Sequence, residues 1–181
     1  MKVLGISGSL RRDSYNMKLL RAAEELLPAV AGFEIWEDLK AVPPFDEDDE
    51  PGGEVVETLR DAVAEADVLL FATPEYNASI PGQLKNAIDW LSRPVATTVL
   101  RGKPALVIGA STGAFGAVWS QAELRKVLAT AGARVVEAEV AVGHAPARFD
   151  ESGMLVDEEI EEQLREALEL LMAEAPVSLA A

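Results

Sequence analysis

Apolar runs and helix-like patterns alternate along this chain from one end to the other. The clearest run covers residues 68–73 and is almost continuously apolar, as is typical of a strand covered on both faces. Between the runs, apolar residues recur at helical spacing. The expected strands are residues 2–7, 33–39, 68–73, 104–110 and 134–142. The expected helices are residues 14–27, 54–65, 81–93, 117–131 and 157–173.

This alternation predicts a doubly wound α/β fold with a five-stranded parallel sheet, because parallel strands need crossover helices between them. The length of 181 residues agrees with one domain. We expect that domain to span residues 1–175, with residues 176–181 as a frayed tail. Periodicity alone leaves both common strand orders open, but in either order a ligand is expected outside the carboxyl ends of the strands.

Composition and charge narrow the partners. The chain carries 31 acidic and 16 basic residues, a net charge of −15, which disfavours nucleic acid or an anionic membrane surface as a partner. No apolar stretch approaches the length of a membrane helix, about 20 residues. The chain has no cysteine and one histidine, so we expect neither disulfides nor a metal site. Together with the lack of a signal-like start, this predicts a cytoplasmic protein.

The first candidate site is the polar loop in residues 5–16, directly after the first expected strand. It lacks the third glycine of a dinucleotide fingerprint and the Gly-Lys pair of a P-loop. It does place hydroxyl, amide and guanidinium groups around a helix N-terminus, where free N–H groups attract anions. We expect it to anchor a phosphate; alternatively, Ser14 only caps the helix and Arg11 is a solvated loop residue. The candidates are Ser9, Arg11, Ser14 and Asn16, with the neighbouring Tyr15.

Two further polar loops follow the third and fourth expected strands. Residues 74–82 combine stiffening prolines with an aromatic ring and hydrogen-bonding groups, which suits the rim of a planar ligand. Capping of the next helix by Ser79, with Pro81 in its first turn, explains only part of this loop. Residues 110–116 are rich in glycine, which permits close approach of the backbone to a ligand, and Phe115 could cover a ring. A flexible turn is the alternative for that third loop.

The remaining candidates have simpler explanations. His144 lacks the nucleophile elbow that a catalytic triad needs, so we do not expect it to be catalytic. The acidic run 46–50 lacks the glycine and the spacing of a calcium loop. Trp90 and Trp119 are expected to pack in the core or against a partner.

The three loops together resemble the NADPH-dependent FMN reductase family, which includes chromate, quinone and azo-dye reductases of flavodoxin-like fold. The matching motifs are G-S-L-R-x-x-S-x-N at 8–16, P-E-Y-N-x-S-x-P-G-x-L-K-N-A-I-D-W at 74–90, and S-T-G at 111–113. The resemblance covers about residues 3–171. It implies strand order 2-1-3-4-5 and FMN at the strand carboxyl ends, with the phosphate at the first loop. The implied positions along the isoalloxazine ring are Pro74, Glu75, Tyr76 and Asn77, with Ser111, Thr112 and Gly113 at its pyrimidine side.

The same resemblance implies an enzyme in which NADPH or NADH reduces FMN, and FMN passes the electrons to a quinone, free flavin, an azo dye or chromate. No side chain is then required as an acid or base, because the flavin carries the chemistry. A homodimer or homotetramer is expected, with residues 42–48 near the contact. Trp90, Leu91 and Trp119, on the helices that begin near Pro81 and Ala117, would add apolar contact surface.

Two other functions remain open from the residues. The first is an electron-carrier flavodoxin that binds FMN without oxidising NAD(P)H; its acidic charge would suit docking to basic partners. Such carriers hold the phosphate with an uncharged loop, whereas this loop contains Arg11. The second is a regulatory nucleotide-binding module without turnover, which the tyrosine-containing loop disfavours.

Overall fold

A computed structural model of the chain describes residues 1–176, so the predicted tail lies outside the described residues beyond Pro176. The strands are β1 (Lys2–Ser7), β2 (Gly32–Trp36), β3 (Val68–Ala72), β4 (Pro104–Ala110), β5 (Arg134–Val135) and β6 (Ala141–Val142). The helices are α1 (Tyr15–Leu26), α2 (Glu54–Glu65), α3 (Gly82–Leu91), α4 (Val118–Thr130) and α5 (Glu158–Ala173).

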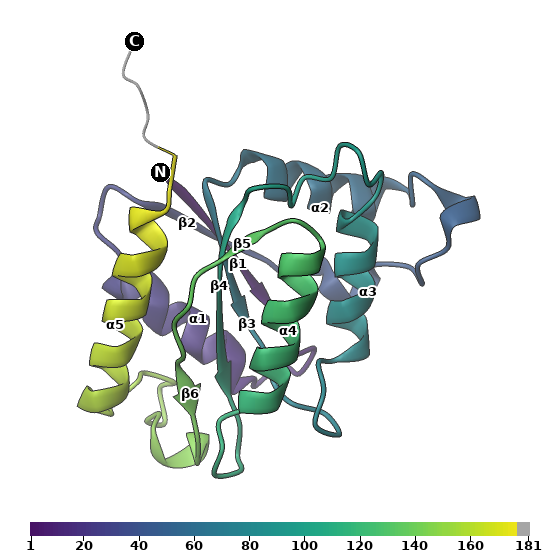
Figure 1. The fold of residues 1–181 in the computed structure, drawn as a ribbon. Coiled ribbons are helices and arrows are strands. Elements are labelled where there is room, and N and C mark those ends of the chain that lie inside the picture. Colours follow the sequence, from purple (N-terminus) through teal and green to yellow (C-terminus); the bar gives the residue numbers. More distant parts are fainter. Residues whose placement is uncertain (177–181) are drawn as a thin grey trace.

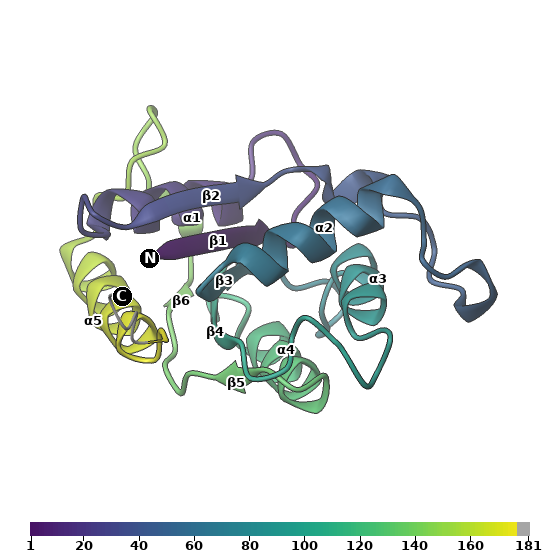
Figure 2. The same cartoon turned by 90° about the horizontal axis from the view of Figure 1, so that it is seen from above.

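A parallel sheet with the order β2-β1-β3-β4-β5 forms the middle of three layers, and β6 pairs with the far part of β4 (Figure 1). Seen from above, α1 and α5 lie on one side of the sheet and α2, α3 and α4 on the other (Figure 2). The predicted doubly wound fold is confirmed. The strand order that the resemblance implied, and that periodicity had left open, is confirmed as well.

Each face of the sheet has its own hydrophobic core, because successive side chains of a strand point to opposite faces. In β3, Leu69 and Phe71 pack under α2, α3 and α4, whereas Val68 and Leu70 pack under α1 and α5. All residues of β3 and β4 are buried, as expected for strands covered on both sides. These two central strands therefore form a rigid base for the loops that follow them.

Two element boundaries differ from the expectation. The second strand ends at Trp36, and Leu39 lies in a short 3-10 helix, Asp38–Ala41, where its side chain is still buried. Because Leu39 is apolar and buried although it lies past the strand, the apolar pattern predicted a strand that is too long. Pro81 is the N-cap of α3 and not part of its first turn, and the helix ends at Leu91.

The expected last strand, residues 134–142, is divided into two short strands. Pro104 pairs with Arg134, and Gly109 pairs with Ala141. Between these two pairs β4 advances by five residues and the neighbouring segment by seven. The two surplus residues leave the sheet in a tight turn, in which the N–H of Ala138 donates to the carbonyl of Val136 at 3.0 Å. The prediction of one continuous strand is wrong, because such a bulge depends on register with a neighbour.

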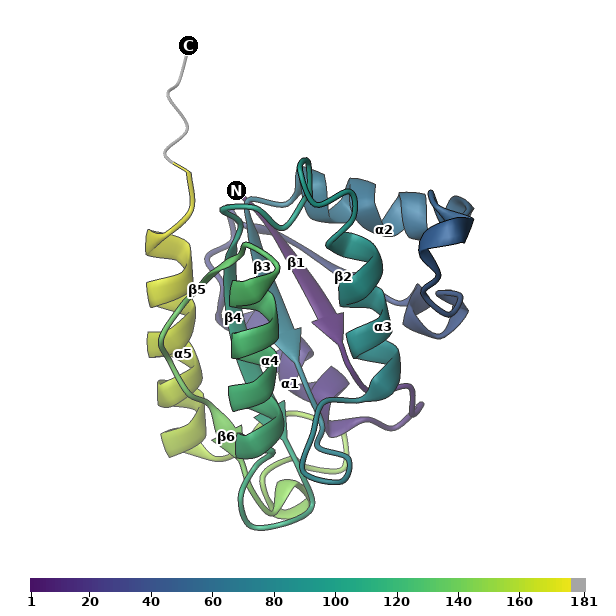
Figure 3. The same ribbon diagram turned by 45° about the vertical axis from the view of Figure 1, so that its right-hand side comes forward.

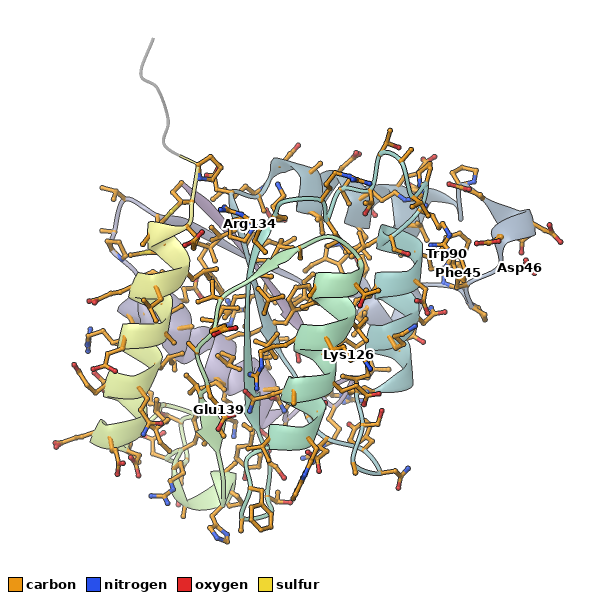
Figure 4. The ribbon with its side chains drawn as sticks, in the orientation of Figure 1. Phe45, Asp46, Trp90, Lys126, Arg134 and Glu139 are labelled. Carbon is orange, nitrogen blue, oxygen red and sulfur yellow. The ribbon has the colours of Figure 1, made fainter. Side chains whose placement is uncertain are left out.

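Trp90 and Leu91 belong to the core, with 0% and 1% of their surface exposed. The indole N–H of Trp90 donates to the carbonyl of Pro43 at 2.9 Å, and Phe45 packs edge-on against the indole with centroids 4.9 Å apart (Figure 4). Trp90 thus anchors the segment that carries the acidic run. The expectation that Trp90 and Leu91 add contact surface for a second subunit is wrong, because the chain buries both by itself.

Within residues 1–176, no helix is both long enough and apolar enough to cross a membrane. The same part of the chain contains no group of three or more His, Cys, Asp or Glu side chains placed to hold a metal ion.

Candidate functional site

Three loops leave the sheet at the carboxyl ends of β1, β3 and β4 and meet at one edge of the molecule (Figure 3). Between them lies a cavity of about 120 Å³. Its lining contains every predicted site residue except Asn77 and Gly113, and it adds Ala110. Asn77 and Gly113 are the chain neighbours of the lining residues Tyr76 and Thr112. The structure therefore brings the three predicted loops together around one space.

The loop after β1 is held mainly by short-range hydrogen bonds. The N–H of Ser9 donates to the hydroxyl of Ser7 at 3.2 Å, and the guanidinium of Arg11 donates to the carbonyl of Asp13 at 3.0 Å. Ser14 is the N-cap of α1, and its hydroxyl accepts the N–H of Met17 at 3.4 Å. The alternative role of Ser14, as the cap of this helix, is therefore confirmed. A capping hydroxyl still carries its own proton, so it can donate to an anion as well.

This loop is a local concentration of positive charge in a protein of net charge −15. Asp13 is paired with Lys18 at 2.9 Å, and this hydrogen bond lowers the pKa of the Asp13 carboxyl. Arg11 and Arg12 form no salt bridge with any residue in the described part of the chain. Because Lys18 balances Asp13, the loop keeps two exposed guanidinium groups unpaired with acids, and of these only Arg11 lines the cavity, where it is available to an anion.

Asn16 has a role that the sequence did not indicate. Its side-chain amide donates to the carbonyl of Ala110 at 3.0 Å and accepts the N–H of the same residue at 2.9 Å. The side chain is buried and ties the start of α1 to the end of β4. The backbone N–H groups of Tyr15 and Asn16 stay free, because N–H groups in the first turn of a helix have no acceptor within the helix.

The loop after β3 contains a tight turn at Asn77 and Ala78. Tyr76 and Ser79 exchange backbone hydrogen bonds of 3.0 and 3.2 Å, and the two residues between them have φ values of 54° and 60°. Positive φ at both central positions is the geometry of a type I′ turn, which strongly favours glycine or asparagine. Holding Ala78 in this region costs free energy, and such strain is concentrated at binding sites. The turn presents Tyr76, which is 47% exposed, at the mouth of the cavity.

Glu75 caps a helix from a distant loop. Its carboxylate accepts the N–H groups of Trp119 and Ser120 at 3.1 and 3.2 Å. The N-cap of α4 is Ala117, which has no side-chain acceptor, so Glu75 supplies the cap and places negative charge at the positive end of the helix dipole. Ser79 likewise donates to Glu123 of α4 at 2.6 Å. The alternative explanation, in which Ser79 caps α3, is wrong, because the N-cap of α3 is Pro81.

The third loop, residues 110–116, is braced by residues 141–145. The N–H of His144 donates to the carbonyl of Gly113 at 2.8 Å, and the N–H of Ala145 donates to the carbonyl of Ser111 at 3.0 Å. A Cβ on Gly143 would lie 2.1 Å from the carbonyl oxygen of Ala114, so only glycine fits there. These contacts argue against the flexible turn that the sequence left open.

The bracing residues are the ones that sequence reasoning missed. Gly116 also permits a close backbone approach, since a Cβ there would lie 2.3 Å from the carbonyl carbon of Ala141. The buried side chain of Gln121 donates to the carbonyl of Gly116 at 2.9 Å. Gly116 and Gly143 were visible as glycines in polar loops, but nothing in the sequence showed that the third loop and residues 141–145 pack against each other at these two positions. Nothing marked Gln121.

His144 is exposed and adopts a left-handed backbone conformation with φ of 50°. Its observed contribution to the third loop is its backbone N–H, which any non-proline residue would also supply.

Larger hollows lie elsewhere. One of about 320 Å³ beside α1 includes a single predicted site residue, Ser14, and two bigger ones include none. One, of about 440 Å³, lies between the C-terminal parts of α3 and α4. The other, of about 610 Å³, lies between α4 and the bulge that separates β5 from β6. The smaller cavity has the phosphate-type loop and the strand ends, so we assign the functional site to it.

Comparison with known proteins identifies the family. A family model described as NADPH-dependent FMN reductase matches residues 1–147. The chain is 42% identical to NAD(P)H-dependent FMN reductase PA1204 of Pseudomonas aeruginosa, with 94% of this chain and 93% of that protein covered. It is 39% identical to the 2-hydroxy-1,4-benzoquinone reductase of a Burkholderia species, with 91% of each covered.

Among solved structures, the fold is similar to FerB, a flavoenzyme NAD(P)H:(acceptor) oxidoreductase from Paracoccus denitrificans. The TM-score is 0.86 at 31% sequence identity, with 97% of this chain and 99% of that chain covered. The family model and these relatives match most of the chain, and the chain belongs to the NADPH-dependent FMN reductase family.

Proposed function

We propose that this protein is an FMN-dependent oxidoreductase that oxidises NADPH or NADH and reduces a quinone or a similar acceptor, such as free flavin, an azo dye or chromate. In the overall reaction with a quinone, NAD(P)H and one proton give NAD(P)⁺ and the hydroquinone. This proposal rests on one observation: the first loop, whose groups suit a phosphate, and the second loop, whose groups suit a planar ring, meet at one cavity. The named activities of the similar proteins support it.

The phosphate of FMN would lie at the start of α1. The free N–H groups of Tyr15 and Asn16 and the hydroxyls of Ser9 and Ser14 supply donors there, and Arg11 supplies charge. The cavity of about 120 Å³ is too small to enclose a whole FMN, so it suits the phosphorylated end, with the ring on the open rim.

The ring would lie between the second and third loops. Bound FMN supplies the hydride-accepting and electron-donating chemistry. Glu75, through its cap on α4, holds the backbone of residues 74–77 in place, and residues 141–145 hold that of Ser111, Thr112 and Gly113. Tyr76 and Asn77 form the exposed rim, which leaves room for the nicotinamide and the acceptor to use one face in turn. We assign no side chain the role of acid or base.

One series of spectra tests this function. The purified protein should bind FMN, and riboflavin much more weakly, because riboflavin lacks the phosphate. Anaerobic NADPH should bleach the flavin absorbance without a partner protein, and a quinone should restore it, with ping-pong kinetics. If dithionite reduces the bound flavin but NADPH and NADH do not, the protein is an electron carrier and the reductase proposal is wrong.

We also propose a homodimer, with a homotetramer as the alternative, that uses the α3 and α4 side of the molecule. The hollow of about 440 Å³ there has apolar walls from Ile88, Val95 and Val127. An acidic segment, residues 46–50, projects beyond α3 and carries the opposite charge (Figure 1). The cations lining the hollow are Lys85, Arg93, Arg101 and Lys126; within the chain, Arg93 already pairs with Glu47 of the acidic segment and Lys85 with Asp89. Light scattering of the FMN-loaded protein at micromolar concentration tests this, and a monomer contradicts it.

A single folding unit in residues 1–175 and a cytoplasmic location belong to the same proposal. One cooperative calorimetric transition and recovery in the soluble cytoplasmic fraction are the expected results. Two separate transitions, or recovery with membranes, would contradict them.

A further inference from the structure

Three aromatic side chains are exposed in the described part of the chain, and all three lie beside the site. Tyr76 is 47% exposed, Phe115 63% and Trp119 51%. Tyr76 belongs to the second loop, Phe115 to the third, and Trp119 to the first turn of α4. Every other aromatic side chain of the protein is buried or partly buried. Large apolar groups left in water at one place mark a binding surface.

Phe115 and Trp119 form an edge-to-face pair with ring centroids 5.1 Å apart and planes at 67°. Trp119 and Glu123 are one helical turn apart and therefore share a face of α4. Glu123 accepts the hydroxyl of Ser79 at 2.6 Å, so this face is turned toward the loop that carries Tyr76. The aromatic pair thus lies on the side of α4 that faces the second loop. It is next to the cavity and not part of its lining, and the backbone of Trp119 bonds to the cavity-lining Glu75.

The pair is attached to a rigid backbone. Phe115 follows the part of the third loop that is held by residues 141–145, and the N–H of Trp119 is fixed by Glu75 at 3.1 Å. The two nearby carboxylates, on Glu75 and Glu123, are both engaged in hydrogen bonds. A ligand would therefore bind to preorganised rings, which lowers the entropy cost of binding.

By itself, the surface of these three rings suits a small ligand better than another protein, although Trp119 shares a face of α4 with Lys126 and Thr130 of the hollow assigned to the dimer. An aromatic side chain buries about 150–250 Å² when fully covered, so three half-exposed rings offer on the order of 300 Å². A stable protein interface needs about 800 Å² from each partner. A planar molecule of two fused rings matches the smaller area.

We propose that Phe115 and Trp119 form the acceptor platform of this enzyme and set its preference for planar two-ring quinones over acceptors that lack a ring. This inference rests on the proposed function. The pair presents a ring face and a ring edge to the guest, and stacked and edge-to-face arrangements are the favoured ones between aromatic groups. Both residues act through binding and take no part in proton or electron transfer.

The test compares Phe115→Ala and Trp119→Ala with the unchanged FMN-loaded enzyme. The acceptors are 1,4-naphthoquinone and ferricyanide, which has no ring to stack. We expect the ratio of kcat/KM for naphthoquinone to kcat/KM for ferricyanide to fall about three- to tenfold in each variant. Trp119→Phe and Phe115→Leu, which keep an apolar side chain, should fold even where the alanine variants do not, and Trp119→Phe should recover most of the ratio. Leu170→Ala, which alters an equally exposed residue on α5, should leave the ratio unchanged.

A second readout does not depend on turnover. Calorimetric titration of 1,4-naphthoquinone into the oxidised, FMN-loaded protein measures binding without reaction, and its Kd should rise by the same factor in both alanine variants. Bleaching of the flavin by anaerobic NADPH in those variants tests the proposed function separately.

An unchanged ratio together with an unchanged Kd in both alanine variants would overturn the platform while leaving the reductase function intact. Equal losses for both acceptors, with a smaller particle by light scattering, would show that the pair is a contact with a second copy of the chain, and the inference would be wrong. If NADPH fails to bleach the flavin, the proposed function fails, and the calorimetric Kd alone decides whether the platform exists.

Discussion

The loop after β1 and the loops after β3 and β4 meet at one cavity but are stabilised in different ways. In the first loop, Ser9, Arg11 and Ser14 bond to partners within three residues along the chain. In the other two, Glu75 reaches the start of α4, and Gly143 fits against Ala114. The first loop therefore leaves its charged groups available to a ligand, whereas the other two use many of their polar groups to fix their own shape.

This difference predicts two kinds of sensitivity to mutation. Changes in the first loop should alter cofactor affinity while the fold stays intact. Changes in the contacts of the second and third loops should lower stability and disturb the site together.

Placing a side chain at Gly143 should have the largest effect on stability. In Gly143→Ala, a Cβ would lie 2.1 Å from the carbonyl oxygen of Ala114, so the loop has to move. We expect the free energy of unfolding to fall by about 2–4 kcal/mol, measured by urea denaturation. The matched control is Gly113→Ala, whose nearest contact is 3.5 Å away, and it should cost less than about 1 kcal/mol. Equal stability of the two variants would mean that the third loop is not braced.

Arg11→Ala should have the next largest effect, on affinity and not on stability. Loss of a hydrogen bond to a charged group costs about 1.5–3 kcal/mol, so FMN should bind about ten- to a hundredfold more weakly by flavin fluorescence titration. Riboflavin affinity should not change, because Arg11 faces the phosphate in our assignment. Arg12→Ala, the neighbouring exposed cation outside the cavity, is the control. A similar loss for riboflavin would contradict the phosphate assignment.

Removing the carboxylate of Glu75 tests how the second loop is coupled to α4. Glu75→Ala leaves the N–H groups of Trp119 and Ser120 without their acceptor and should lower stability by about 1–2 kcal/mol. Glu75→Gln retains an acceptor oxygen without the charge and should recover about half of that loss. Glu123→Ala removes only an exposed contact and should cost less than about 0.5 kcal/mol. If thermal unfolding gives the same midpoint for Glu75→Ala and Glu123→Ala, the cap contributes nothing.

The smallest effect is expected from His144→Asn. Asparagine tolerates the left-handed conformation and keeps the backbone N–H that donates to Gly113. Turnover should stay within about threefold of the unchanged enzyme in steady-state assays, since no side chain is asked to move a proton. A hundredfold loss would show that His144 acts through its imidazole.

The sequence predicted the parts of the fold that depend on local pattern. The bounds of α2 and β4 match the structure because their periodicity is strong and uninterrupted. The division of the last strand could not be predicted, because it arises from a two-residue mismatch with β4. The strand order came from family resemblance and not from periodicity.

The sequence predicted which residues gather around the cavity but not the contacts that they make. The side chain of Asn16 bonds to a residue 94 positions away, and that of Glu75 to residues 44 and 45 positions away. The local sequence pattern does not indicate whether a polar side chain binds a ligand or supports a loop. Hydroxyl and amide groups at strand ends therefore indicated the place of the site more accurately than their own roles in it.

The brace from residues 141–145 also has a consequence for how this protein matures in the cell. Chains emerge from the ribosome with the amino terminus first. The first and second loops of the site are made early, but the third loop has no support until residue 145 has been added. Loading of the cofactor therefore needs a chain that has been made at least as far as residue 145, and a nascent chain that stops before residue 141 carries both motifs without the brace of the third loop.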